Sequence, residues 1–168
     1  MLLCRRHRQL VRAMVLQATA LEWSSTRRER NHWRVVRIAA PVLRLFSSPQ
    51  FVDARIRHLI NKKSEVFECR DWIVGEIRRN DPWTIGQAGR ALGEYDARSW
   101  AHELNVPIVM AVTTKDQLVA PEKQHQLAEA LKAHTVLVEG NHFVSLVSPQ
   151  SYASVTRSAI DDVLGKLE

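Results

Sequence analysis

Residues 107–121 read PIVMAVTTKDQLVAP, and residues 134–143 read HTVLVEGNHF. Each stretch contains a run of apolar residues, at 108–113 in the first and at 135–138 in the second. The runs are nearly continuous rather than alternating, which is typical of strands buried on both faces of a parallel sheet. Pro121 stands where a proline favours the first turn of a helix, and it predicts a helix over 121–132. The order strand, helix, strand predicts a parallel βαβ unit.

The same α/β pattern continues toward both ends of the chain. Residues 13–18 form a third apolar run with strand character, and the Arg-rich residues 2–11 before it indicate the end of a helix. Residues 99–104 predict a short helix, and residues 149–167 predict a closing helix. The predicted fold class is therefore α/β, with about three parallel strands, each apolar on both faces.

Residues 22–96 have a different character and predict only helices. Thr26 and Glu29 have the spacing of a capping box at the start of a first helix. Further helical runs cover 51–63, 66–79 and 83–95. The predicted organisation is a core segment at 1–21, a helical insertion at 22–96, and a second core segment at 97–168.

Composition and charge narrow the class of protein. The 168 residues are 45% hydrophobic and 25% charged, which is ordinary for a globular chain. No apolar run reaches the length of a membrane span, and the N-terminus does not have the pattern of a signal peptide. Cys4 and Cys69 form neither a disulfide framework nor a zinc pattern, so we expect a cytoplasmic protein without a metal. The net charge of +6 is uneven, because residues 1–63 carry +11 and the remainder −5.

Asp116 and His142 are the residues that best fit a chemical role. Each follows a predicted strand, and functional groups of open α/β sheets lie beyond the carboxyl ends of the strands. A carboxylate beside an imidazole fixes the tautomer of the ring, which then takes the proton of a nucleophile. From the pattern alone, the alternative remains open that both are ordinary solvated loop residues.

The two loops together resemble those of the α/β-hydrolase family. Residues 107–121 resemble its acid-bearing strand and loop, and 135–143 resemble its histidine loop, with Gly140 two residues before the histidine. Residues 13–19 resemble the strand that follows the nucleophile helix, and 22–96 resemble the helical cap. The resemblance implies Asp116 as the acid and His142 as the base of a serine hydrolase, with no cofactor and with a small lipophilic ester or acyl compound as substrate. The cap would supply apolar walls for that substrate.

The sequence departs from the family at the nucleophile. The family carries its serine on a Gly-x-Ser-x-Gly elbow, but no such motif occurs here, and the first glycine is Gly75. The elbow would precede Met1, so we expect the C-terminal part of a hydrolase that is inactive alone. Cys4 would lie inside the helix rather than at its tip, and Ser24, Ser25 and Ser145 lack the strand–turn–helix context of a nucleophile. The subfamily, whether esterase, epoxide hydrolase or haloperoxidase-like, stays open.

Two further expectations concern partners. Without its neighbouring strands the sheet would expose an edge, which predicts self-association. A second hypothesis is a non-catalytic remnant, or a module that binds an anionic surface or nucleic acid. It rests on Arg27, Arg30, Arg34 and Arg37, whose spacing of 3, 4 and 3 puts them on one helix face. No nucleic-acid-binding motif accompanies them, so we expect no specific nucleic-acid partner.

Overall fold

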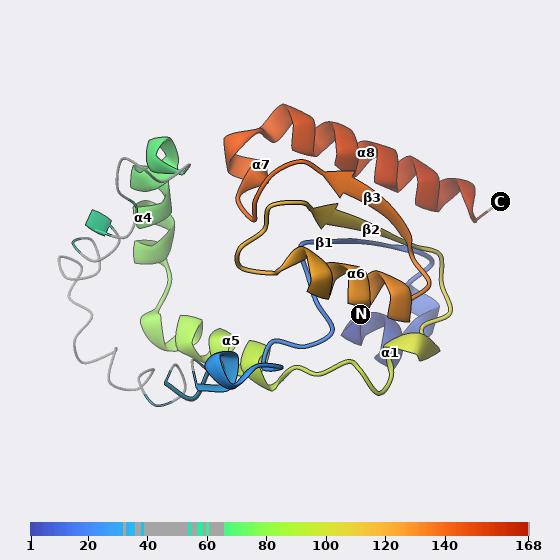
Figure 1. The fold of residues 1–168 in the computed structure, drawn as a ribbon, viewed down its shortest axis with the longest axis horizontal. Coiled ribbons are helices and arrows are strands. Elements are labelled where there is room, and N and C mark those ends of the chain that lie inside the picture. Colours follow the sequence, from blue (N-terminus) through green and yellow to red (C-terminus); the bar gives the residue numbers. More distant parts are fainter. Residues whose placement is uncertain are drawn as a thin grey trace. The chain divides into compact units, whose positions relative to one another are not determined.

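A computed structural model describes residues 1–31, 33–35, 38, 54, 57, 58, 60 and 66–167 of the chain. The chain divides into two compact units (Figure 1). The first, called the sheet unit below, consists of Met1–Glu22 and Asp96–Glu168. The second, called the helical unit, is Trp23–Tyr95.

Three parallel strands form the centre of the sheet unit. They are β1 (Met14–Gln17), β2 (Ile108–Thr113) and β3 (His134–Val138), in the order β1-β2-β3. The register pairs Val15 with Val109, and Thr113 with Val138. The three predicted strands and their parallel direction are therefore confirmed.

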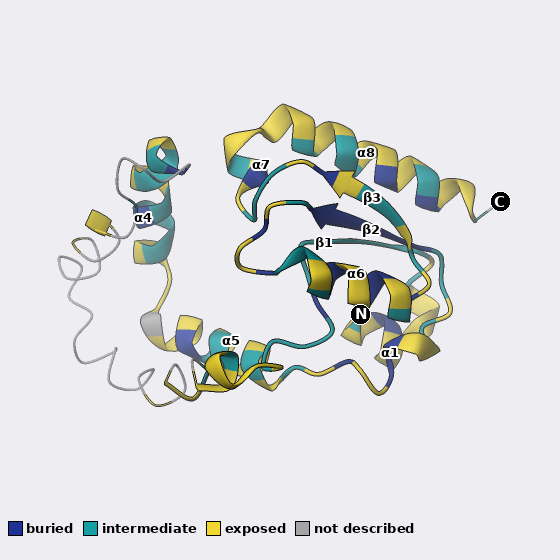
Figure 2. Cartoon of the chain, in the orientation of Figure 1, coloured by how far each residue is buried: buried dark blue, intermediate teal, exposed yellow. Residues whose placement is uncertain are grey.

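Strand β2 is the core of this unit, since all six of its residues are buried (Figure 2). Successive side chains point to opposite faces of a sheet. Val109 packs on one face against Ala159 and Val163 of helix α8 (Pro149–Gly165). The alternate residues of β2, Met110 among them, point to the other face, which helix α6 (Pro121–Ala130) covers (Figure 1).

The prediction that every strand is buried on both faces is wrong for β1 and β3. All four residues of β1 are only partly buried, and Leu137 of β3 is 60% exposed. Both strands lie at edges of the sheet, and among the described residues no strand pairs with the second edge of β1. A groove lies between the start of β1 and the C-terminal part of α8. It is lined by residues 10–15 together with four residues of the chain's end, Ile160, Val163, Leu164 and Leu167.

The segment before β1 is not one continuous helix. Helix α1 (Leu2–Arg6) ends at His7, and a 3-10 turn, η1 (Arg8–Leu10), follows. The Arg8 guanidinium donates hydrogen bonds to the carbonyl oxygens of Val11 and Asn105 at 2.9 and 2.7 Å. These bonds tie the segment to the chain that leads into β2, and they account for the bend.

Two other short elements differ from the predictions. The predicted helix at 99–104 is only a 3-10 turn, η3 (Ala101–Glu103), because a tight turn at 98–100 precedes it. Helix α7 (Val144–Val147), directly after His142, was not predicted.

The helical unit begins with the predicted capping box. The Thr26 hydroxyl accepts a hydrogen bond from the Glu29 backbone N–H at 3.1 Å, and the Glu29 carboxylate accepts one from the Thr26 N–H at 2.9 Å. After the 3-10 turn η2 (Phe67–Cys69) come α4 (Arg70–Arg79) and α5 (Pro82–Glu94). Most of the predicted helix at 51–63 lies outside the described residues.

The burial of β2 makes a testable prediction about stability. Met110 is fully buried, so Met110→Ala removes apolar contacts and leaves a cavity. We expect the free energy of unfolding in urea to fall by about 2–5 kcal/mol. Leu137→Ala, at an exposed position of the same sheet, is the control and should change it by less than about 0.5 kcal/mol. Equal losses in the two variants would contradict the burial of β2 as the core.

Candidate functional site

The sheet brings Asp116 and His142 together. Because β2 and β3 are neighbouring parallel strands, their carboxyl ends meet at one edge of the sheet. Asp116 follows β2 and His142 follows β3, and the Asp116 Oδ2 lies 2.9 Å from the His142 Nδ1. The two residues singled out in the sequence are therefore hydrogen-bonded partners.

Asp116 is held from several sides. Its Oδ1 accepts hydrogen bonds from the backbone N–H groups of Leu118 and Val119 at 2.9 and 2.8 Å. Its Oδ2 accepts one from the Thr113 hydroxyl at 2.8 Å, in addition to the contact with His142. The side chain is inaccessible to solvent. A buried carboxylate with this many donors is fixed in both position and orientation.

These contacts set the charge of the Asp116 carboxyl. Burial by itself raises its pKa, since it disfavours the charged form. The hydrogen bonds from the Val119 N–H, His142, Thr113 and the Leu118 N–H act in the opposite direction and outweigh it. The pKa of Asp116 therefore lies below its ordinary value, and the group is a carboxylate at neutral pH.

The two loops that carry the pair are also bonded to each other. The Thr114 N–H donates to the Val138 carbonyl at 3.0 Å, and the Lys115 N–H donates to the Gly140 carbonyl at 2.9 Å. The Thr114 hydroxyl donates to the Glu139 carboxylate at 2.9 Å. These bonds continue the β2–β3 ladder past the strand ends and tie the two loops together.

Gly140 meets a steric demand of the histidine loop. Its φ is +149°, and a Cβ there would lie 2.7 Å from the Val144 Cγ2. Other residues rarely adopt this φ, and the approach to Val144 leaves no room for a side chain. Beyond it, the Asn141 side chain accepts the Phe143 N–H at 2.8 Å, which closes a tight turn around His142.

The other nitrogen of His142 is available for chemistry. The side chain is one-third exposed, and no hydrogen bond joins Nε2 to any residue that the structure describes. With Nδ1 donating to the carboxylate, Nε2 carries a free lone pair that can accept a proton. The pair can thus act as a general base toward a group placed beside Nε2.

None of the candidate nucleophiles considered in the sequence makes a hydrogen bond to this nitrogen among the described residues. Cys4 is buried within α1, and Ser145 lies exposed in α7. Ser24 and Ser25 belong to the helical unit. Within the described part of the chain, no serine or cysteine side chain hydrogen-bonds His142.

Two buried polar residues next to Asp116 were not identified from the sequence. Thr113 and Gln124 are buried and hydrogen-bonded to each other, the Gln124 Nε2 donating to the Thr113 Oγ1 at 2.8 Å. A signal for Gln124 was present, because it precedes Leu127, Ala128 and Leu131 on the buried face of the helical segment. A polar residue in such an apolar row needs a hydrogen-bond partner inside the protein.

Part of the predicted arginine face lies in the helical unit. Arg27, Arg30 and Arg34 are on the helical residues that follow the capping box, whereas Arg37 lies outside the described residues. The Arg30 guanidinium donates to the backbone carbonyls of Ser24 and Ser25 at 3.4 and 2.6 Å. It therefore serves to hold the start of its own helix.

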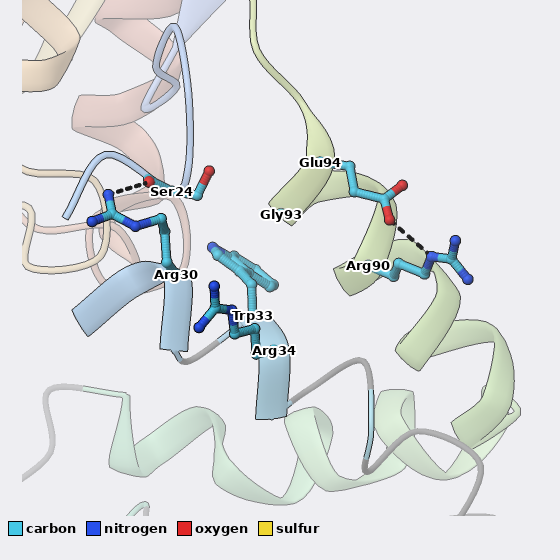
Figure 3. A pocket seen from close by; sticks show the side chains of 7 residues that line it. All are labelled: Ser24, Arg30, Trp33, Arg34, Arg90, Gly93 and Glu94. Atoms are coloured by element: carbon cyan, nitrogen blue, oxygen red, sulfur yellow. Dashed lines mark hydrogen bonds and ion pairs between the residues drawn. The ribbon is translucent and has the colours of Figure 1, made fainter. Parts of the chain in front are cut away.

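A pocket lies next to this face within the helical unit (Figure 3). The Trp33 ring lines it and packs so closely on Gly93 that a Cβ there would be 2.6 Å from the ring. The Arg90 guanidinium donates to the Glu94 carboxylate at 3.0 Å, which partly neutralises the positive charge. The other residues that line the pocket are Ser24, Arg30 and Arg34.

No group of three histidine, cysteine or acidic side chains among the described residues is arranged to hold a metal ion. No helix in the same part of the chain is long and apolar enough to cross a membrane.

Solved structures resemble the chain closely in fold and weakly in sequence. An enol-lactonase from Burkholderia xenovorans LB400 superposes with a TM-score of 0.71 at 17% identity, over 95% of this chain and 60% of the enzyme. A thermophilic esterase from Thermogutta terrifontis, solved with malate bound, gives 0.69 at 17% identity, over 95% and 59%. MGS-M2, an α/β-hydrolase enzyme from a Medee basin deep-sea metagenome library, gives 0.67 at 11% identity, over 95% and 60%.

The chain has the α/β-hydrolase fold. It spans about 60% of the length of these solved structures. No protein-family model and no curated protein matches its sequence. The α/β-hydrolase fold thus follows from the arrangement of the elements, and the Asp116–His142 pair is the chemical feature that the fold displays here.

The depressed pKa of Asp116 predicts a pH dependence of stability. In the unfolded chain an aspartate has a pKa of about 3.9, and above that pH the Asp116 carboxylate stabilises the fold. This contribution is lost as the pH falls through the lower pKa that Asp116 has in the folded protein. Asp116→Asn should therefore lower the free energy of unfolding at pH 7, by about 1–3 kcal/mol. The difference from wild type should shrink below about pH 4.

Denaturant unfolding at pH 7 and at pH 3 measures this difference. Asp161→Asn, at an exposed position on α8, is the matched control and should behave like wild type at both pH values. A loss in Asp116→Asn that is the same at both pH values would mean that the charge of Asp116 plays no part in stability.

Proposed function

We propose that the sheet unit carries the acid–base half of a serine hydrolase site, with Asp116 as the acid and His142 as the base. The observation that carries the proposal is the 2.9 Å hydrogen bond between them at the carboxyl edge of an α/β-hydrolase sheet. Two of the solved structures with a similar fold are an enol-lactonase and an esterase, which favours an ester or a related acyl bond as the target.

In this proposal the nucleophile is a serine on an upstream Gly-x-Ser-x-Gly elbow, and the chain is the C-terminal part of the enzyme. The serine oxygen attacks the acyl carbon while its proton moves to the His142 Nε2. The leaving alcohol takes that proton as its bond to the acyl carbon breaks. Water then attacks the acyl carbon of the acyl-serine while its proton moves to the His142 Nε2. The serine oxygen takes that proton as its bond to the acyl carbon breaks, and the carboxylic acid leaves. Throughout, Asp116 keeps the ring oriented and stabilises its protonated form.

The helical unit is proposed as the cap that covers the substrate. Its apolar residues include the exposed Trp72 and Trp83, at 57% and 37%. Exposed aromatic side chains on an inserted helical unit suit contact with a lipophilic acyl group. The substrate proposed is accordingly a small lipophilic ester.

The alternative, a remnant or an anion-binding module, has less support. Arg30 of the arginine face donates to backbone carbonyls at the start of its own helix, which leaves fewer of its N–H donors for a ligand. The pair at Asp116 and His142 is meanwhile assembled with a free Nε2. The hydrolase proposal accounts for that assembly, and the binding module does not.

The test compares the chain alone with a version extended upstream to include the elbow. The chain alone should show no ester turnover above that of its own His142→Ala variant. The extended protein should turn over short-chain p-nitrophenyl esters, and His142→Ala should lower its kcat by about 10⁴-fold or more. Steady-state kinetics with both proteins measures this effect.

His125→Ala is the matched control, because His125 is an exposed histidine on α6. It should leave turnover of the extended protein unchanged. Active extended protein whose kcat is insensitive to His142→Ala would remove His142 from the mechanism. Peptide mapping of the native protein shows whether residues upstream of Met1 carry the elbow.

We also propose that the chain alone self-associates through the open edge of β1. The groove at the start of β1 includes Ile160 and Leu164, which are 42% and 52% exposed. Unpaired strand edges next to apolar surface favour association. Sedimentation velocity should show species larger than a monomer, and Ile160→Lys should shift them toward the monomer. Leu118→Lys, at an exposed leucine outside the groove, should not. A monomeric wild-type chain would refute the proposal.

A further inference from the structure

We propose that Gln124 is a positioning residue for the Asp116–His142 pair. Through Thr113 it directs a hydroxyl proton onto the Asp116 Oδ2, and it thereby holds that oxygen beside the His142 Nδ1, where it keeps the ring proton. This inference rests on the proposed function, and it adds a residue that never touches substrate but sets the state of the base.

Gln124 is fully buried in the first turn of α6, and all its polar atoms are used. Its Oε1 accepts the Thr113 N–H at 3.0 Å. Its Nε2 donates to the Thr113 Oγ1 at 2.8 Å and to the Val119 carbonyl at 2.7 Å. The Asp116 Oδ2 lies farther away, 3.4 Å from Nε2.

The partners fix which way the amide points. The Thr113 backbone nitrogen can only donate, so the atom facing it must be the amide oxygen. The Val119 carbonyl can only accept, so the atom facing it must be the amide nitrogen. The orientation of Gln124 is thus determined by two independent contacts.

This orientation gives the hydrogen-bond chain a direction. Because the Thr113 Oγ1 accepts from Gln124, its own proton is free to go to the Asp116 Oδ2, 2.8 Å away. Oδ2 is then an acceptor toward Thr113 and toward His142 as well. The carboxylate can only accept, so the His142 Nδ1 is the donor, and the hydrogen bond from Thr113 holds Oδ2 where Nδ1 can reach it. The Nε2 lone pair is then free for a nucleophile's proton.

Gln124 supports the other carboxylate oxygen too. The Val119 carbonyl that it holds belongs to the same loop whose N–H groups at Leu118 and Val119 bind Oδ1. Hence one buried amide braces both oxygens of Asp116, one through a hydroxyl and the other through the loop backbone.

The variants separate hydrogen bonding from packing. Gln124→Met keeps an unbranched side chain of similar length but removes every hydrogen bond. Thr113→Val keeps the branched shape but removes the hydroxyl. Gln126→Met, at an exposed glutamine on the same helix, is the matched control. Circular dichroism establishes that each variant is folded.

The readout is the protonation pattern of the His142 ring. The full chain is labelled with ¹⁵N-histidine, and ring nitrogen shifts are recorded by NMR at alkaline pH, with the His142 signals assigned through His142→Gln. Magic-angle spinning serves if the chain self-associates. Wild type and Gln126→Met should show a neutral ring protonated on Nδ1. Gln124→Met and Thr113→Val should each lose this preference and show averaged nitrogen shifts.

A merely structural role would not give this pattern, since it changes stability and leaves the tautomer as it is. If the effect passes through the hydroxyl, the double variant should show no loss beyond that of Thr113→Val. A folded Gln124→Met or a folded Thr113→Val that keeps the proton on Nδ1 would overturn the inference. So would a wild-type ring without that proton. The tautomer is measured without a nucleophile, so this result is independent of whether the extended protein hydrolyses esters.

Discussion

The register of β2 against β3 is the constraint on which the site depends. Thr113 pairs with Val138, so β2 and β3 end at the same level and the loops that carry Asp116 and His142 start side by side. One residue along a strand is about 3.3 Å, which is more than the length of the hydrogen bond between them. A slip by one residue would therefore separate the pair and would also turn the apolar residues of β2 to the wrong faces. Burial of β2 between α6 and α8 prevents that slip, and so the core and the site have a common cause.

A buried charge follows from this arrangement and needs its own support. Burial disfavours the charged form of Asp116. Hydrogen-bond donors from the end of β2, from the following loop and from His142 compensate for this cost. Most of these donors lie within three residues of Asp116, so the loop forms a nearly complete shell for its own acid. Two further donors, His142 and the side-chain amide of Gln124, come from more distant positions in the sequence.

The sequence predicted those parts that depend on neighbouring residues. Apolar runs found the three strands, the Thr26–Glu29 spacing found the capping box, and positions after strand ends found Asp116 and His142. The break at His7, by contrast, depends on a hydrogen bond from Arg8 to the distant Asn105. The partial exposure of Leu137 depends on which strands lie at the edges. Periodicity carries no information about either, because both are set by tertiary neighbours.

The pair is also self-contained in a way that bears on its function. Every hydrogen bond that fixes Asp116 comes from residues between Thr113 and His142, which form one βαβ unit with its two loops. None of these hydrogen bonds requires a nucleophile to be present. A group placed beside the His142 Nε2 would meet an imidazole ring that is already oriented, and no reorganisation of the carboxylate would be required. The same independence explains how a chain without a Gly-x-Ser-x-Gly motif keeps the hydrogen-bonded pair, because the groups that fix Asp116 all lie within residues 113–142.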